Sequence, residues 1–337
     1  MTARCRWASV DDVPRIAEFL LEGFGPASIQ CLPGRFEWLL VNNPFGFHAT
    51  IAESGGRIVA FRGCLPFSCE GLPGVRAAFG MDFLVLPEHR RQGIGRSLLQ
   101  LALERFELAV TTAPSPANEQ LYRGMGAREL TGVYSAFCRC ARPAGNGRPR
   151  SLARDWVSYA YYRCLAAPRA QVRQVDLEGT CERAVDGAPR LAGVEFGASR
   201  GAEFLRWRYG RGPYARDYVL LELGQGGSSP AVAVVRPTAG GVALVDLLCG
   251  PDGRSGALAA LAGGRLGDST TSLFAGEPLK RAFRRAGYLA RRSPGAVLAL
   301  SRHEKLLTEL SRLRWISFPG DSDMDLVRQP APIAPGV

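Results

Sequence analysis

The segment Met81–Gln100, MDFLVLPEHRRQGIGRSLLQ, most constrains how this chain folds. Met81–Leu86 is a short apolar run with one acidic residue, and Pro87 ends it, which predicts a strand rather than a buried helix. Apolar residues at helical spacing begin at Ile94 and predict an amphipathic helix. The segment therefore predicts a strand, a turn and a helix in close succession.

The turn between strand and helix is predicted to bind an anion. Gly93 and Gly95 lack a Cβ where backbone must approach another group, and the first-turn N–H groups of a helix have no intrahelical acceptor. The helix dipole adds positive charge there, and Arg90, Arg91 and Arg96 surround it with guanidinium groups. A Walker loop requires a lysine and a hydroxyl after its last glycine, and a Rossmann fingerprint requires a third glycine. The segment has no lysine after Gly95 and no third glycine, so it matches neither pattern.

The segment resembles the acetyl-CoA pyrophosphate loop of the GNAT acyltransferases. Their pattern is Arg/Gln-x-x-Gly-x-Gly/Ala after a strand that ends in Val-x-Pro, and it is matched here by Arg90, Gly93, Gly95, Val85 and Pro87. The predicted element order over residues 4–140 is also similar to the order of that family. A plain basic glycine turn is the simpler alternative, which the strand, proline and helix together disfavour.

Beyond this region the chain repeats itself. Trp38 and Trp207 lie 169 residues apart (207 − 38), each in a similar local sequence. Other recurring pairs, in the same order, are Pro44 and Pro213, Glu53 and Glu222, Asp82 and Asp246, and Tyr122 and Phe283. A colinear repeat of this length indicates two copies of one fold. The second copy has a shorter turn, Asp252–Gly256, without the arginine cluster.

The resemblance and the repeat together imply an α/β protein with two GNAT folds in tandem. Each fold would have a mixed, mostly antiparallel central sheet flanked by helices. The expected organisation is an acetyltransferase domain with an intact loop at 1–142, a linker and connecting helix at 143–167, a degenerate GNAT-like domain at 168–327 and a disordered tail at 328–337. The chain also resembles bacterial tandem-GNAT proteins found among cell-surface polysaccharide genes, through FEWLLVNNP, FLRWRY and Gly320-Asp321-Ser322-Asp323 after Trp315.

Composition narrows the protein class. The 337 residues carry a formal net charge of +11, but the arginines are scattered and no nucleic-acid-binding motif is present, which disfavours a nucleic-acid partner. The sequence contains no apolar run of the ~18 residues that a membrane span needs and no signal-peptide pattern, so a cytoplasmic protein is expected. The nine cysteines lack metal-ligand spacing and are interpreted as reduced, small core residues.

The resemblance implies roles for individual residues. Backbone groups of Phe83, Leu84 and Val85 would pair with the pantetheine arm of acetyl-CoA, the cosubstrate, and Tyr122 would protonate the leaving sulfur. Where the family has an asparagine that bonds the pantetheine, this chain has Ser115, and Asn118 lies one helical turn before the tyrosine, so either residue would serve. The pyrophosphate would be held by the loop residues Arg90, Arg91, Gln92, Gly93, Ile94, Gly95 and Arg96.

The general base is the least defined part of the site. Asp82 is the only acid in the central strand, and a partly buried carboxylate with a raised pKa could take a proton from an ammonium. Strand alternation and its recurrence as Asp246 favour a structural role instead. Glu37 and His48 are further candidates, His89 is expected to be solvated, and a water relay could replace a dedicated base.

The sequence therefore predicts an acetyl-CoA-dependent N-acetyltransferase without a metal, which acts on a primary amine of a small acceptor. The narrower resemblance suggests an amino sugar or sugar nucleotide for surface polysaccharide. A small metabolite or antibiotic amine is the alternative acceptor. A non-catalytic acyl-CoA-binding scaffold is the alternative from another class. A homodimer is compatible with the sequence.

Overall fold

This computed structural model describes residues 3–139, 149–165, 171–185, 195–224, 231–238, 241–263 and 268–317. Residues 143–148 and 166–167 of the expected linker and connecting helix, the expected tail at 328–337 and the sequence Gly320-Asp321-Ser322-Asp323 lie outside the described residues. No helix of the described residues is long and apolar enough to cross a membrane.

The chain forms two compact units, and each unit is assembled from separate sequence segments. Unit 1 consists of Met1–Leu130, Arg211–Pro213 and Gly295–Leu313. Unit 2 consists of Thr131–Gly210, Tyr214–Pro294 and Arg314–Val337. Each unit is a mixed sheet with mostly antiparallel pairing and flanking helices, which confirms the predicted fold class.

Unit 1 holds the segment from which the sequence analysis began. Its strands are β1 (Arg4–Trp7), β2 (Ala49–Ser54), β3 (Arg57–Glu70), β4 (Arg76–Val85), β5 (Leu108–Thr112) and the later part of β13 (Leu289–Leu300), and they pair in this order. The pairing is antiparallel throughout, except that β4 and β5 are parallel. Its helices are η1 (Val10–Asp12), α1 (Val13–Phe24), η2 (Ile29–Cys31), η3 (Glu37–Val41), η4 (Pro87–His89), α2 (Ile94–Arg105), α3 (Pro116–Gly124) and α9 (Glu304–Leu310).

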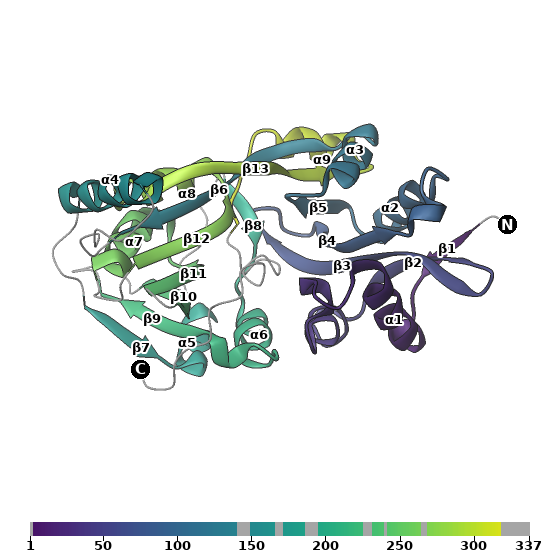
Figure 1. Cartoon of the computed structure of the whole chain (residues 1–337), viewed down its shortest axis with the longest axis horizontal. Helices are drawn as coiled ribbons and strands as arrows, with labels where there is room; N and C mark the ends of the chain where they lie inside the picture. Colours follow the sequence, from purple (N-terminus) through teal and green to yellow (C-terminus); the bar gives the residue numbers. More distant parts are fainter. Residues whose placement is uncertain are drawn as a thin grey trace. The chain divides into compact units, whose positions relative to one another are not determined.

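Helices α1 and α2 lie on opposite faces of the unit 1 sheet (Figure 1). Leu84 of β4 packs over Gly23 of α1, whereas Phe83 and Val85 point towards α2. Helix α2 forms because Ile94, Leu98, Leu99, Ala102 and Leu103 recur at helical spacing and are all buried. The alternation of side chains along β4 thus fixes which of its residues face each helix.

The outer edge of β5 is completed by a strand from the far end of the chain. Val297 to Leu300 of β13 pair with Thr112 to Ala109 of β5 in antiparallel register. Leu298 and Leu300 are buried in the same apolar cluster as Leu99 of α2. Unit 1 therefore obtains its last strand from residues near the end of the second sequence repeat.

Unit 2 has the same arrangement of strands. Its strands β7 (Val172–Val175), β9 (Val219–Leu223), β10 (Ala231–Thr238), β11 (Gly241–Leu248), β12 (Asp268–Ala275) and β6 (Arg128–Cys138) pair in this order, and only β11 and β12 are parallel. The last strand, β6, comes from the first repeat. A separate parallel pair joins β8 (Glu195–Ala198) to β14 (Arg314–Trp315). The helices are α4 (Pro149–Leu165), α5 (Leu177–Val185), α6 (Ala202–Leu205), η5 (Arg206–Gly210), η6 (Ala215–Asp217), η7 (Pro251–Gly253), α7 (Arg254–Gly263) and α8 (Glu277–Arg285).

The two units share an uncommon helical feature at the same point of the repeat. Helix η3 (Glu37–Val41) and helix η5 (Arg206–Gly210) are both π-helices and lie 169 residues apart (206 − 37). π-helical turns are rare, so their recurrence at the offset of the tryptophan pair is independent support for the repeat.

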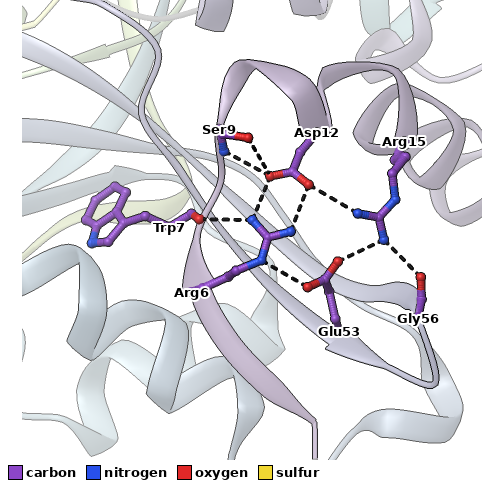
Figure 2. Close-up of polar contacts among 7 residues, drawn as sticks. All are labelled: Arg6, Trp7, Ser9, Asp12, Arg15, Glu53 and Gly56. Atoms are coloured by element: carbon purple, nitrogen blue, oxygen red, sulfur yellow. Dashed lines mark hydrogen bonds and ion pairs between the residues drawn. The ribbon is translucent and has the colours of Figure 1, made fainter.

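A ring of four charged side chains anchors β1 and α1 to the β2–β3 hairpin (Figure 2). Arg6 donates to both carboxylate oxygens of Asp12, at 2.6 and 2.8 Å, and to Glu53 at 2.9 Å. Arg15 closes the ring by bonding the same two carboxylates, at 3.2 and 2.8 Å. The hydrogen bonds from Arg6 are the main reason that the pKa values of Asp12 and Glu53 lie below their ordinary range.

Candidate functional site

The start of α2 has the features of an anion site. Its N-cap is Gly93, with φ of +78° and no side-chain cap. Ser97 donates its N–H to the Gly93 carbonyl at 3.0 Å, which is the first hydrogen bond of the helix. The N–H groups of the three residues between them therefore have no acceptor within the helix. These groups and the helix dipole favour a negatively charged ligand at this end.

Exposed arginines surround this helix start. Arg90 and Arg91 are exposed in the turn that precedes it, and Arg96 is exposed in the first helical turn. The side chain of Arg90 donates to the Val85 carbonyl at 3.0 Å, and that of Arg96 donates to the Gly124 carbonyl at 3.1 Å. Gln92 is also exposed and bonds the backbone of the preceding turn. Arg90 is thus attached to the end of β4, and Arg96 to the end of α3.

Gly95 marks the point where β4, α2 and α3 converge. A Cβ at this position would lie 3.3 Å from Leu121 of α3 and 3.5 Å from Phe83 of β4. The first distance is tighter than most Cβ contacts and the second is an ordinary van der Waals contact, so a larger residue would require Leu121 to shift by a few tenths of an ångström. The glycine pattern recognised in the sequence therefore has two causes: the left-handed backbone at Gly93 and the close packing at Gly95.

Strand β4 leaves its parallel partner soon after the pairing starts. Ala77, Ala78 and Phe79 pair with Leu108, Ala109 and Val110 of β5, and among the described residues the ladder ends there. Strand β4 continues to Val85, paired on its other edge with β3. A bulge interrupts that pairing between Phe61 and Gly63, and Asp82 within it has φ of +49°. A bulge leaves backbone groups unpaired, so this part of β4 can bond an extended ligand.

Asp82 is held by a buried ion pair. Its carboxylate accepts two hydrogen bonds from Arg35, at 2.8 and 3.0 Å, and the two side chains are 2% and 0% exposed. The residue as a whole is nevertheless only half-buried, so its exposed part is backbone. The carboxylate is therefore turned away from the surface that the backbone presents. This geometry favours a structural role for Asp82, because a bidentate arginine stabilises the ionised carboxylate.

Tyr122 of α3 lies against β4 at the point where the two parallel strands separate. Its side chain is buried, and a Cβ on Gly80 would lie 2.9 Å from its hydroxyl oxygen. Gly80 directly follows Phe79, the last β4 residue paired with β5. The hydroxyl oxygen accepts a hydrogen bond of 3.1 Å from Arg62 of β3. The phenol is thus fixed in position beside the bulged part of β4.

The polar residues that precede Tyr122 have different environments. Ser115 is exposed and is the N-cap of α3, where its hydroxyl accepts from the Asn118 N–H at 3.4 Å. A cap accounts for serine at this position without any ligand. Asn118 is half-buried and lies one helical turn before Tyr122.

Among the described residues, no hydrogen bond or ring contact joins the other base candidates to Tyr122. Glu37 is exposed on η3, and His89 is half-buried in η4. His48 packs edge-on against Trp7 and Phe106. Arg105 approaches its Nδ1 at 3.0 Å and can only donate, so Nδ1 accepts and the ring is neutral. Burial, followed by the charge of Arg105, lowers the pKa of His48.

Three residues of this region were missed by the sequence analysis: Arg35, Arg62 and Gly80. The only local signal was the position of Arg62 and Gly80 inside apolar strand sequences. The partner of Arg35 lies 47 residues away, and no local pattern indicates it. Among the described residues, no group of three or more His, Cys, Asp or Glu side chains could hold a metal ion.

The profile of the acetyltransferase (GNAT) family matches residues 13–127. This segment forms a GNAT acetyltransferase domain. It contains the β4–α2 loop, the bulged part of β4 and Tyr122. The predictions of a GNAT protein and of a GNAT-type acyltransferase are confirmed by this match.

Solved structures of a probable N-acyltransferase, an N-acetyltransferase and Eis1 share the fold over most of this chain. A probable N-acyltransferase from Enterococcus faecalis has a TM-score of 0.60 at 15% identity, covering 89% of this chain and 72% of that one. A GCN5-related N-acetyltransferase from Anabaena variabilis has a TM-score of 0.56 at 13% identity, with coverages of 88% and 72%. Eis1 from Mycobacterium abscessus has a TM-score of 0.54 at 15% identity, with coverages of 91% and 75%. No curated protein matches the chain in sequence.

The corresponding region of unit 2 differs from the GNAT domain in its polar groups. Helix η7 leads directly into α7, whose first residue, Arg254, is buried and bonds Glu195 at 3.1 and 2.7 Å. Phe283 occupies the place of Tyr122 on α8, in an apolar cluster. Asp246 keeps its counterpart's role as a buried carboxylate, because Arg200 and Tyr209 both bond it.

Proposed function

We propose that the GNAT domain binds acetyl-CoA and transfers its acetyl group to a primary amine of a small acceptor. One observation carries the proposal: the uncapped start of α2, the bulged part of β4 and Tyr122 are joined by direct contacts around Gly95 and Gly80. An acyl-CoA requires an anion site for its pyrophosphate and an extended backbone for its amide-containing arm. This region offers both.

The residues that would hold the cosubstrate follow from their environments. The N–H groups from Arg91 through Arg96 and the three guanidinium groups would bind the pyrophosphate. Backbone groups of Phe83, Leu84 and Val85 would pair with the pantetheine amides, and an N–H near Val85 would polarise the thioester carbonyl. Asn118 is better placed than the capping Ser115 for a further bond to this arm, because it is half-buried in the same helix as Tyr122.

Tyr122 would supply the proton for the departing sulfur. Tyrosine side chains in general are suitable acids for a departing thiolate, because model phenols and thiols have pKa values of ~10 and ~8–9. Asp82 would shape the bulge through its pair with Arg35 rather than act as base. The proton of the acceptor amine would then leave through solvent.

The preferred acceptor remains an amino sugar or sugar nucleotide, by resemblance to tandem-GNAT proteins of polysaccharide genes. A small metabolite or antibiotic amine is the alternative within the same chemistry. The net charge of +11 weakly disfavours a strongly cationic acceptor. We further propose that the protein acts in the cytoplasm. The second repeat, proposed from the sequence at 168–327, would have no acetyl-CoA site of its own, because its loop arginines and the tyrosine hydroxyl have been replaced.

An acceptor screen tests the proposal. The full chain is incubated with acetyl-CoA and a panel of amino sugars, nucleotide-linked amino sugars, polyamines and aminoglycosides, and free thiol is measured. Amine-dependent thiol release is expected, and Tyr122→Phe should lower its kcat by about 10²–10⁴-fold. Tight acetyl-CoA binding without thiol release from any amine would favour the scaffold alternative.

A further inference from the structure

Arg62 is a buried arginine in an unusual environment. It lies on β3 with 0% exposure. Its Nη2 donates to the Tyr122 hydroxyl at 3.1 Å, and its Nη1 donates to the Cys64 sulfur at 2.8 Å. Its Nε has no hydrogen-bond partner among the described residues. Among the described residues, Arg62 thus donates to one hydroxyl and one sulfur, and to no carboxylate.

Among the described residues, three other buried arginines have buried carboxylate partners, whereas Arg208 donates to the Tyr218 hydroxyl at 2.9 Å. Arg35 bonds Asp82, Arg200 bonds Asp246 and Arg254 bonds Glu195. The sulfur beside Arg62 does not replace such a partner. Burial raises the pKa of the Cys64 thiol, and the opposing effect of Arg62 is smaller, so this sulfur is neutral. A buried charge without a counter-ion is destabilising, which indicates that Arg62 is present for a reason other than stability.

The direction of the hydrogen bond determines what Arg62 does to Tyr122. A guanidinium group only donates, so the phenol oxygen accepts and its own hydrogen must point elsewhere. Gly80 permits this arrangement, because a Cβ there would lie 2.9 Å from the phenol oxygen and 3.0 Å from Nη2 of Arg62. Arg62 therefore fixes the oxygen while leaving its proton free to be donated to another group.

The equivalent positions of unit 2 carry none of the three groups involved: the arginine, the tyrosine hydroxyl and the glycine. Phe283 replaces Tyr122, and Leu244 stands two residues before Asp246, where unit 1 has Gly80 two residues before Asp82. Ala233 and Val235, on the strand equivalent to β3, are buried with Phe283 and Leu244 in one apolar cluster. The buried aspartate is retained in both units, but the arginine, the tyrosine hydroxyl and the glycine are absent together from the second. This pattern links Arg62 to Tyr122 rather than to the fold.

We infer that Arg62 is a positioning residue for Tyr122, an inference that rests on the proposed acetyl transfer. During transfer, the bond between the amine nitrogen and the acetyl carbon forms, the thioester C–S bond breaks and its electron pair leaves on sulfur. Tyr122 gives its hydroxyl proton to that sulfur, and Arg62 stabilises the negative charge left on the phenol oxygen. The amine loses one proton to solvent, and Tyr122 regains one from solvent.

A double-mutant cycle tests the inference. The variants are Arg62→Met, Tyr122→Phe and the double variant, with Arg62→Lys as the conservative replacement and Cys64→Ser as the control that changes the other contact of Arg62. Thiol release from acetyl-CoA is measured with the best amine of the acceptor screen, and acetyl-CoA binding is measured by calorimetry. Thermal unfolding identifies any variant that fails to fold.

Arg62→Met is expected to lower kcat by about 10–100-fold, while the KM and Kd for acetyl-CoA stay within about twofold. The double variant should be no slower than Tyr122→Phe, because Arg62 acts only through the phenol. Arg62→Lys should recover part of the rate, and Cys64→Ser should match the wild type. If Arg62→Met does not fold, Arg62→Lys takes its place in the cycle. Its effect on kcat is then compared between the wild-type background and the Tyr122→Phe background.

Three results would overturn the inference, and they fall into two kinds. Additive losses in the double variant, or a wild-type kcat in Arg62→Met, would show that Arg62 does not act through Tyr122 although the protein is an acetyltransferase. A wild type that releases no thiol with any amine would refute the proposed function itself, and the inference with it. The two failures are therefore distinguishable.

Discussion

Arg35 holds the carboxylate of Asp82 through two hydrogen bonds of 2.8 and 3.0 Å, while the backbone of Asp82 adopts φ of +49° at the centre of the β4 bulge. The side chain of Asp82, the only acid of the central strand, is thus buried against Arg35, whereas its backbone is exposed on the other side. A left-handed conformation costs a non-glycine residue about 1–3 kcal/mol, so other contacts must maintain it. The ion pair with Arg35 is such a contact, and it links the bulge to the segment directly before η3.

The first prediction concerns this pair. Asp82→Asn should lower the free energy of unfolding by about 3–5 kcal/mol, because it leaves the Arg35 charge buried without its partner. The double variant Arg35→Met/Asp82→Leu should be less destabilised than either single change, since no charge is left unpaired. Urea unfolding of the wild type, Asp82→Asn, Arg35→Met and the double variant measures this. A stable Asp82→Asn protein that binds acetyl-CoA but no longer transfers acetyl would contradict the account and make Asp82 a base.

The second prediction concerns acid sensitivity of the ring formed by Arg6, Asp12, Arg15 and Glu53. Hydrogen bonds from Arg6 hold the pKa of Asp12 and of Glu53 below ordinary values. Because the folded-state values are lower than the unfolded ones, the ring stabilises the fold fully above about pH 5, and this stabilisation is lost as pH falls through the folded-state values. Unfolding free energies at pH 7 and pH 3 measure the loss.

Asp12→Asn should cost about 1–3 kcal/mol at pH 7 and should show a smaller loss between pH 7 and pH 3 than the wild type. The exposed neighbour Asp11 supplies the control, because Asp11→Asn removes the same charge from the same turn. That variant should keep the pH dependence of the wild type. Equal losses in Asp12→Asn and the wild type would show that the ring does not carry the effect.

The third prediction follows from the strand that β13 contributes to unit 1. A fragment that ends at residue 142 lacks Val297–Leu300, which pair with β5, and lacks the apolar side chains of Leu298 and Leu300. It would expose a strand edge beside an incomplete core, so we expect it to aggregate. Co-expression with residues 143–337 should restore a soluble complex. A soluble, monomeric fragment with a cooperative unfolding transition would contradict this expectation.

Much of the fold was predictable because local patterns determine it. The end of the central strand and the start of the following helix were predicted to within one residue, because an apolar run, Pro87 and a helical spacing follow one another there. The recurrence of Trp38 at Trp207 predicted a second copy of the fold, and each tryptophan now lies in a π-helix at the same offset.

The parts that sequence reasoning missed depend on distant pairings. The pattern of β13 is the same whichever sheet the strand joins, so its pairing with β5 left no local signal. Arg35 and Asp82 are 47 residues apart in the sequence, and Arg62 and Tyr122 are 60 residues apart. Strand alternation alone also could not show the bulge that reorients the backbone at Asp82.

The most direct test of the acetyl-CoA site is calorimetric titration of acetyl-CoA into the full chain and into Gly93→Asp/Gly95→Asp. The matched control is Gly55→Asp/Gly56→Asp, which adds the same charges at positive-φ glycines in the β2–β3 turn, where a Cβ would meet no neighbour. We predict micromolar binding by the wild type and the control, and a loss of about a hundredfold or more, equivalent to ~2.7 kcal/mol, in the loop variant. Absence of binding by the wild type, or equal binding by the loop variant, would contradict the account.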